Sequence, residues 1–326
     1  EARGFNHSQW SIAWPGDGGD ALLIVDDAAA APLRDAAPPA AAAQFTRGQT
    51  TRQATHRRFG LGILLLIALP LLLLAGLMLA IEPLADRVVA HTPAAVEARI
   101  GEAVLARTRA EGRMITDGPA FEALQTIGKR LARPGETLQF HLAGRADINA
   151  FAAPGGVVVV YSGLMKKAAS AEEVAGVLAH EIAHVELRHS LRQMVRAAGL
   201  QVIAAALFGD YAGLGQLGAQ LGALKFSRDA EREADARGLQ RLADARIDPG
   251  GLLRFFESLA ASEGRAAALP AVLSTHPATA ERIAALRQAI AAQPGVEVTP
   301  LAVDWPAVQA ALAGARHQDR PQGHQR

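Results

Sequence analysis

The sequence predicts a mainly α-helical protein that also has a small β-sheet, one transmembrane helix and a small β-rich N-terminal fragment. Three observations lead to this fold class. Several segments after residue 82 have helical periodicity, two short runs have the pattern of strands, and residues 59–81 form an unbroken apolar stretch. The 326 residues are enough for one large domain with appendages.

Charge and cysteine content limit the classes of function. The formal net charge is +1, which argues against a nucleic-acid partner recruited by electrostatics. The chain has no cysteine, so it has neither a disulfide nor a thiolate metal site.

Residues 1–34 read as a β-rich module. Short apolar runs that contain Trp10 and Val25 flank a turn of proline, aspartate and glycine residues, which is the pattern of a β-hairpin. The sequence begins at Glu1 rather than at a methionine, so we expect the start of this module to be missing. Residues 35–58 begin with an alanine- and proline-rich run, and we expect them to be a linker.

Residues 59–81 begin at Phe59, end at Ile81 and contain no charged side chain. As a helix they are about 34 Å long, enough to cross a hydrocarbon core of about 30 Å. Leucine on every side argues against a buried soluble helix, and the length and position argue against a signal peptide. Arginines precede the stretch, whereas Glu82 and Asp86 follow it, so the positive-inside rule places the N-terminal module in the cytoplasm and the rest outside.

Residues 82–300 are expected to form the main domain, followed by a short helix and a polar tail at 301–326. Ser170 and Glu173 form a capping box, and the helix that starts there is expected to run to about residue 207. Residues 199–223 are rich in glycine, alanine and leucine, and Asp210 interrupts them. Their apolar runs are too short to span a bilayer, so we expect an apolar loop or helical hairpin near the active site or the membrane. The other expected elements are helices at 93–110, 118–132 and 305–313 and strands at 137–142 and 157–161.

The central motif is H-E-x-x-H, from His180 to His184. Residues four apart on a helix lie about 40° apart round its axis, so both imidazoles can bind one Zn²⁺ ion. Glu181 can then hold and deprotonate a water on that metal. Two solvated histidines on an amphipathic helix are the alternative, unless a third ligand exists.

A third ligand is expected on a later helix. Glu231 and Asp235 are four residues apart on one face, so Glu231 can reach the metal while Asp235 accepts a hydrogen bond from a ligand imidazole. Glu233 points about 200° away. His189 lies about 180° from His180 on one continuous helix and is interpreted as a surface residue.

The motifs together resemble the HtpX, BepA and CAAX-prenyl-protease group of zinc metalloendopeptidases, the gluzincins. They are H-E-I-A-H, S-R-D-A-E-R-E-A-D, a preceding N-A-F-A-A-P-G-G-V-V-V-V and a following S-T-H-P-A-T-A-E-R-I, in the family order over residues 93–292. The resemblance implies an α+β zincin-like domain that binds one Zn²⁺ through His180, His184 and Glu231, with Glu181 as catalytic base and Asp235 behind the ligands.

The resemblance also implies how substrate and membrane are arranged. A peptide would add to an edge strand that begins at Gly156 and ends at Tyr161. The single span makes prenylated substrates improbable and suggests a bacterial inner-membrane protein with a periplasmic protease domain, acting on misfolded or envelope proteins. The competing class is a membrane-tethered chaperone or assembly factor with a regulatory or latent zinc site.

His276 has three possible roles. In BepA-like proteases the matching histidine can cap the zinc and hold the enzyme latent, and it could alternatively help catalysis. It could also merely precede a helix that Pro277 begins, because proline suits the first helical position.

Overall fold

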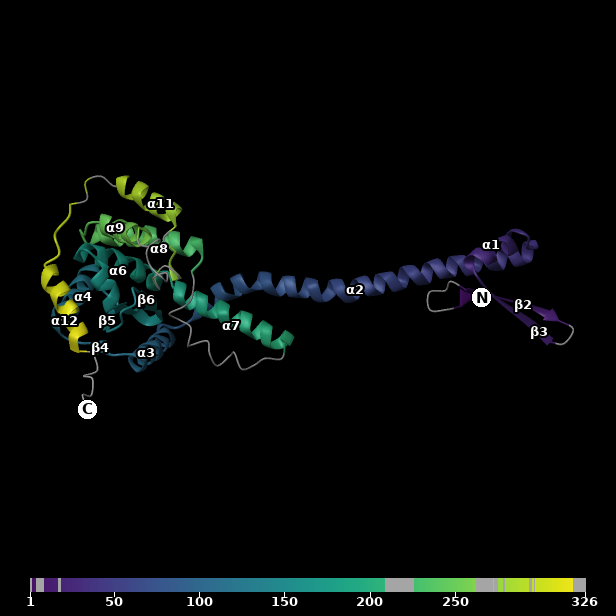
Figure 1. Ribbon diagram of the computed structural model, residues 1–326, viewed down its shortest axis with the longest axis horizontal. Helices are drawn as coiled ribbons and strands as arrows, with labels where there is room; N and C mark the ends of the chain where they lie inside the picture. The colour runs from purple at the N-terminus through teal and green to yellow at the C-terminus, as the bar shows by residue number, and fades with distance from the viewer. Residues whose placement is uncertain are drawn as a thin grey trace, which may run out of the picture. The chain divides into compact units, whose positions relative to one another are not determined.

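The computed structural model describes residues 2–3, 9–16, 19–208, 226–261, 272, 275–277, 279–292, 295 and 297–318. The chain forms two compact units, Glu1–Ala80 and Ile81–Arg326. The elements are labelled along the chain in Figure 1.

The first unit contains the expected hairpin. Strands β1 (Ala2–Arg3), β2 (Gln9–Gly16) and β3 (Gly19–Asp26) form an antiparallel sheet, in which Trp10 pairs with Val25. The segment 35–58, expected to be a linker, is mostly helical, because α2 (Pro39–His91) begins within it shortly after α1 (Asp27–Asp35) ends. Alanine has the highest helix propensity, and a proline is tolerated in a first turn, so the alanine- and proline-rich run can be helical.

Helix α2 contains the apolar stretch. Among the described residues, one helical segment, Arg57–His91, is long and apolar enough to cross a membrane, and the apolar window within it is not buried by other parts of the chain.

The second unit is built on a four-stranded sheet with the order β4-β5-β7-β6. Strands β5 and β7 are parallel and the other two pairings are antiparallel. The strands are β4 (Met114–Ile115), β5 (Gln139–Ala143), β6 (Ala150–Ala153) and β7 (Val157–Tyr161), and a 3₁₀ turn, η1 (Pro154–Gly156), joins the last two.

Helices cover both faces of this sheet. Val158 and Val160 point into a core shared with α4 and α6, whereas Val157 and Val159 point into a second core shared with α3.

The prediction that the strand ending at Tyr161 is an edge strand is wrong, because β7 lies between β5 and β6, and β6 is the edge. The helices of this unit are α3 (Ala94–Glu111), α4 (Gly118–Leu131), α5 (Ser162–Lys167), α6 (Ala171–Glu186), α7 (His189–Phe208), α8 (Arg228–Asp244), α9 (Gly250–Ala260), α11 (Ala280–Ala291) and α12 (Trp305–Gln318).

Helix α6 lies at the centre of this unit, between the sheet and helices α8 and α9 (Figure 1). Its N-terminus is the predicted capping box: Ser170 Oγ accepts a hydrogen bond from Glu173 N, and the Glu173 carboxylate accepts one from Ala169 N. Gly176 of α6 and Gly251 at the start of α9 bring the two backbones into contact, because a Cβ at Gly176 would lie 2.4 Å from Leu252 N.

The helix that begins at Ser170 does not run to residue 207. It ends at Glu186, and α7 starts at His189 after Arg188 takes the left-handed conformation, with φ of 54°. The Arg188 side chain fixes this break, because its guanidinium donates to Val89 O at 2.8 Å and pairs with Glu97 at 2.5 Å. The rest of the 199–223 segment, from residue 209, lies outside the described residues.

The C-terminal helix is longer than predicted. Helix α12 extends to Gln318 rather than to residue 313, and it packs against α4 and α5. Residues 319–326 lie outside the described part of the chain.

Candidate metal centre and active site

Helices α6 and α8 bring three of the predicted residues together. His180 Nε2 lies 3.1 Å from His184 Nε2, so both ring nitrogens point at one place, as their spacing predicts. Glu231 of α8 approaches from the facing helix, with its carboxylate oxygens 3.5 Å from His180 Nε2 and 3.7 Å from His184 Nε2. All three side chains are buried.

His276 completes the cluster from the segment before α11. Its Nδ1 lies 2.8 Å from Glu231 Oε1 and 3.3 Å from His180 Nε2. Thr279 is the N-cap of α11, which starts at Ala280, so Pro277 precedes this helix and does not begin it. The His276 side chain faces the cluster and does no capping.

These four residues, the metal-ligand cluster, could hold a metal ion. One candidate ligand atom from each of His180, His184, Glu231 and His276 lies within 4.8 Å of the other three. Three imidazoles and one carboxylate are a donor set that suits borderline divalent metals. The nitrogen and oxygen atoms of these four side chains face one another in a buried site, an arrangement that a bound cation would stabilise.

Glu181 lies beside the cluster rather than within it. Its side chain is buried, and its Oε1 has no hydrogen-bond partner in the described part of the chain; His276 Nε2 is 3.5 Å away. An unpaired buried carboxylate oxygen requires an explanation, and a base that waits for a substrate proton provides one.

Asp235 lies behind His180, as predicted. Its Oδ1 is 3.0 Å from His180 Nδ1, so the other ring nitrogen, Nε2, is left to face the cluster. Asp235 in turn receives two hydrogen bonds of 2.7 Å from Arg282.

Arg282 is a buried site residue that the sequence reasoning missed. Besides Asp235, it contacts Glu231 Oε2 at 2.6 Å and donates to Pro277 O at 3.0 Å, so it ties the third ligand to the His276 segment. The signal was present in the sequence, because two carboxylates expected at one buried site need a cation, and Arg282 lies in the same motif as His276.

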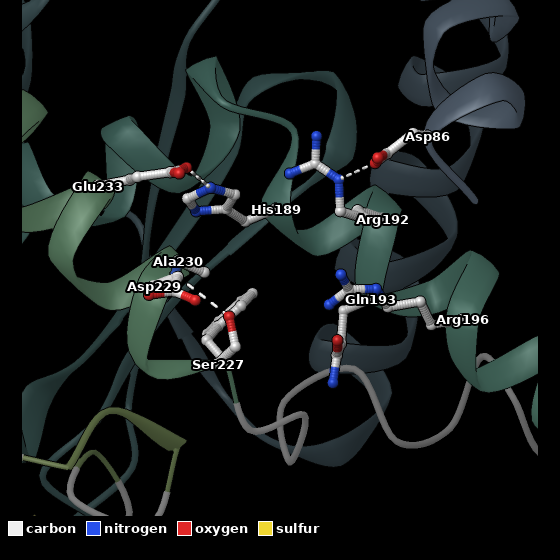
Figure 2. Close-up of a pocket in the computed structure, with 10 residues that line it drawn as sticks. Asp86, His189, Arg192, Gln193, Arg196, Ser227, Asp229, Ala230 and Glu233 are labelled. Atoms are coloured by element: carbon white, nitrogen blue, oxygen red, sulfur yellow. Dashed lines mark hydrogen bonds and ion pairs between the residues drawn. The ribbon is translucent and has the colours of Figure 1, made fainter. Parts of the chain in front are cut away.

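The interpretation of His189 as a surface residue is wrong. It is buried, and its Nδ1 lies 3.0 Å from His184 Nδ1 while its Nε2 lies 3.2 Å from a Glu233 oxygen. Figure 2 shows this contact between His189 and Glu233 at the edge of a cavity of about 330 Å³. The break at Arg188 rotates His189 towards the site, which a single continuous helix would not allow. His189 thus holds His184 as Asp235 holds His180.

The charges of the metal-free site follow from these contacts. Burial disfavours a charged His180, but hydrogen bonds to Asp235 and Glu231 outweigh it and raise the pKa of His180 to about 9. Burial and the neighbouring His180 and His276 lower the pKa of His184. Burial raises the pKa of Glu181, the direction that makes a carboxylate a stronger base.

The fold and the H-E-x-x-H site define a metallopeptidase. The family model for peptidase family M48 matches residues 120–290, a range that contains all six predicted site residues, and the chain belongs to this family.

Named relatives agree with this assignment. The chain is 33% identical over 218 residues to a putative beta-barrel assembly-enhancing protease of Vibrio cholerae, covering 61% of this chain and 45% of that protein. It is 36% identical over 180 residues to metalloprotease LoiP of Escherichia coli, covering 52% and 70%. It is also 36% identical over 149 residues to the mitochondrial metalloendopeptidase OMA1 of Schizosaccharomyces pombe, covering 44% of each. The chain spans about half the length of several of these relatives.

Proposed function

We propose that this metallopeptidase is a membrane-anchored zinc endopeptidase that cleaves misfolded or envelope proteins. The observation that carries the proposal is the buried cluster of His180, His184 and Glu231 with Glu181 beside it, whose Oε1 has no hydrogen-bond partner in the described part of the chain. A purely structural metal site has no use for such a base. Two histidines and a glutamate, without cysteine, suit zinc in a catalytic site that keeps its fourth position open.

The chain's own residues divide the work of peptide hydrolysis. Zinc, when bound by His180, His184 and Glu231, would polarise the scissile carbonyl and lower the pKa of the attacking water towards 7. Glu181 accepts a proton from that water and passes it to the leaving amine. Asp235 and His189 keep the two imidazoles oriented.

We propose that substrate adds to β6 rather than to β7. The edge strand β6 packs beside α6, and the Ala152 backbone reaches Glu181 on that helix. An extended peptide that pairs with an edge strand gains backbone hydrogen bonds regardless of its sequence, which suits an enzyme with misfolded substrates.

The anchor is the apolar stretch of α2. The arginines before Phe59 and the acidic residues after Ile81 favour a cytoplasmic N-terminus and a periplasmic protease domain in a bacterial inner membrane. Relatives named as beta-barrel assembly-enhancing proteases support an envelope substrate. A reporter that is active only in the cytoplasm, fused after Arg316, should be inactive; an active fusion would reverse the orientation.

The test of the proposed activity is cleavage of casein by the full chain in detergent. We expect zinc-dependent cleavage that a chelator abolishes, and we expect Glu181→Gln to lower the rate by about 10²–10⁴-fold with zinc still bound. A wild-type chain that binds zinc but cleaves no unfolded substrate would favour the chaperone or assembly factor instead. Loss of zinc in Glu181→Gln would make Glu181 a ligand.

We propose that His276 is a latch. Its ring lies between Glu231 and Glu181, the space that the attacking water needs, so the enzyme would be off until the segment moves. His276→Ala should then raise basal proteolysis, self-cleavage included, with zinc retained. A variant slower by tenfold or more, about 1.4 kcal/mol of transition-state stabilisation, would instead make His276 a catalytic helper.

A further inference from the structure

The first half of α7 lies along the last turns of α2 in antiparallel register. Arg188 donates to Val89 O at 2.8 Å, and Arg192 Nε donates to Asp86 Oδ1 at 2.7 Å. Arg196 then pairs with Glu82. Each step of four residues forward along α7 therefore corresponds to three or four residues backward along α2. Figure 2 shows Arg192 and Arg196 on this side of α7, with Asp86 opposite.

In α2 and in α7, the charged residues end next to one another, at Glu82 and Arg196. Glu82 is the first charged residue after the apolar stretch of α2, and Arg196 is the last charged residue of α7. Residues 197–209 contain no charged side chain. The pair of Arg196 and Glu82 thus marks one plane at which both helices change from charged to apolar.

Helix α7 continues well past that plane. Phe208 is its last residue, and the twelve residues after Arg196 extend about 18 Å at 1.5 Å per residue. That length is similar to one leaflet, about half of a 30 Å hydrocarbon core. A helix satisfies its own backbone hydrogen bonds, so it can enter lipid without a partner.

The beginning of this apolar half has open space around it. Leu200 is 46% exposed, and a Cβ built at Gly199 would meet no heavy atom within 4 Å in the described part of the chain. An uncharged helix that projects from a domain and leaves leucine exposed needs a covering surface. The pair of Arg196 and Glu82 places the start of this apolar half next to the residue at which the apolar stretch of α2 ends.

We propose that the second half of α7, residues 197–208, is embedded in the lipid bilayer beside the membrane end of α2. This inference rests on the proposed transmembrane anchor and goes beyond it, because it gives the protease domain a second contact with lipid. The pair of Arg196 and Glu82 lies at the membrane surface, where charged side chains keep their water.

The proposed contact of α7 with lipid also determines the distance between the active site and the membrane surface. His189 at the start of α7 lies 3.0 Å from His184 of the metal-ligand cluster, and Arg196 is seven residues further on. Along the helix this separation is about 10 Å. The cluster therefore works close to the membrane surface, within reach of polypeptide segments that emerge from the bilayer.

The absence of native cysteine makes a direct test possible. Single-cysteine variants Leu200→Cys and Leu207→Cys of the full chain are labelled with an environment-sensitive fluorophore and reconstituted in phosphatidylcholine vesicles. Leu72→Cys, within the apolar stretch, is the lipid control, and Arg287→Cys, which is 62% exposed on α11, is the water control. Retained casein cleavage shows that each labelled chain is folded.

Lipids with a nitroxide on the acyl chain should quench the fluorophore at residue 207 as strongly as the one at residue 72. Lipids with a nitroxide at the headgroup should quench the fluorophore at residue 200. Aqueous iodide should quench only the fluorophore at residue 287. If residue 72 is quenched by lipid while residues 200 and 207 respond to iodide, the insertion of α7 is overturned and the anchor stands. If residue 72 also responds to iodide alone, both the anchor and the insertion are overturned.

Discussion

Two polar clusters include residues of both α6 and α8, and their charges are balanced in opposite ways. In the metal-ligand cluster the acceptor atoms of His180, His184 and Glu231 converge on one another. In the second, the arginine cluster of Arg133, Glu136, Glu186, Arg237 and Arg241, positive and negative groups alternate.

The arginine cluster has its charge complement within the chain. Arg241 is 1% exposed and donates from both terminal nitrogens to Glu136, at 2.7 and 2.6 Å, and to Glu186 at 2.8 Å. The metal-ligand cluster has only Arg282 as a permanent cation among the described residues. A cluster of alternating charge therefore holds helices together, whereas a cluster in which metal-binding atoms converge provides a site for a cation.

The largest expected effect is on metal binding. Glu231→Ala removes a ligand, so the metal affinity should fall by more than the roughly 10–100-fold typical of losing an outer partner. Glu233→Ala, which acts only through His189, should cost less, and the 78%-exposed Asp229 is the control for which Asp229→Ala changes nothing. Metal per chain after dialysis against a zinc buffer measures this. If Glu233→Ala loses metal and Glu231→Ala keeps it, the assignment of the third ligand is wrong.

A substitution in the arginine cluster should change the stability of the fold without changing metal binding. Arg241→Met removes the buried cation that pairs with Glu136 and Glu186, and it should lower the free energy of unfolding by about 3 kcal/mol, with the metal affinity unchanged. Arg246→Met, at an arginine whose side chain is 60% exposed, should change stability by less than about 0.5 kcal/mol. Denaturant titration of both variants checks the difference. An equal loss of unfolding free energy in both variants would mean that the arginine cluster stabilises the fold no more than an exposed arginine does.

The smallest effect is a loss of thermal stability at low pH. Burial alone would raise the pKa of Glu136 and of Glu186, but hydrogen bonds from Arg241, and from Arg237 to Glu186, outweigh it and lower both. These contacts therefore stabilise the folded state fully when the pH is above 4.5, the ordinary pKa of a glutamate. The stabilisation is lost as the pH falls through the lowered pKa of the folded state. Between about pH 5 and pH 3 the melting temperature of the wild type should fall more steeply than that of Arg241→Met. Parallel slopes would contradict this origin of the acid sensitivity.

Much of the site could be predicted from sequence because helical spacing is local. The positions of His180, His184 and Glu231 in one cluster, and of Asp235 behind it, followed from residues four apart on two helices. His189 could not be placed this way, because Arg188 enters the left-handed region without a glycine or proline to signal the break. Its conformation depends on contacts with Val89 and Glu97, about ninety residues earlier in the chain.

The strand order was mistaken for a different reason. Four consecutive valines, Val157 to Val160, have no polar alternation, which is the pattern of a strand buried on both faces. That pattern was available in the sequence and argues against an edge. The family resemblance implies a substrate strand beside the turn at 154–156, but it could not decide which of the two strands that flank this turn is the edge.

The glycine contact between α6 and α9 has a consequence for protein engineering. Replacing a helical glycine with alanine commonly stabilises a protein by about 0.4–1 kcal/mol, because it restricts the unfolded chain. At these two positions the sign reverses, since a methyl group at Gly176 would lie 2.4 Å from Leu252 N and one at Gly251 would lie 2.1 Å from Glu172 O. A thermostable variant must therefore keep both glycines.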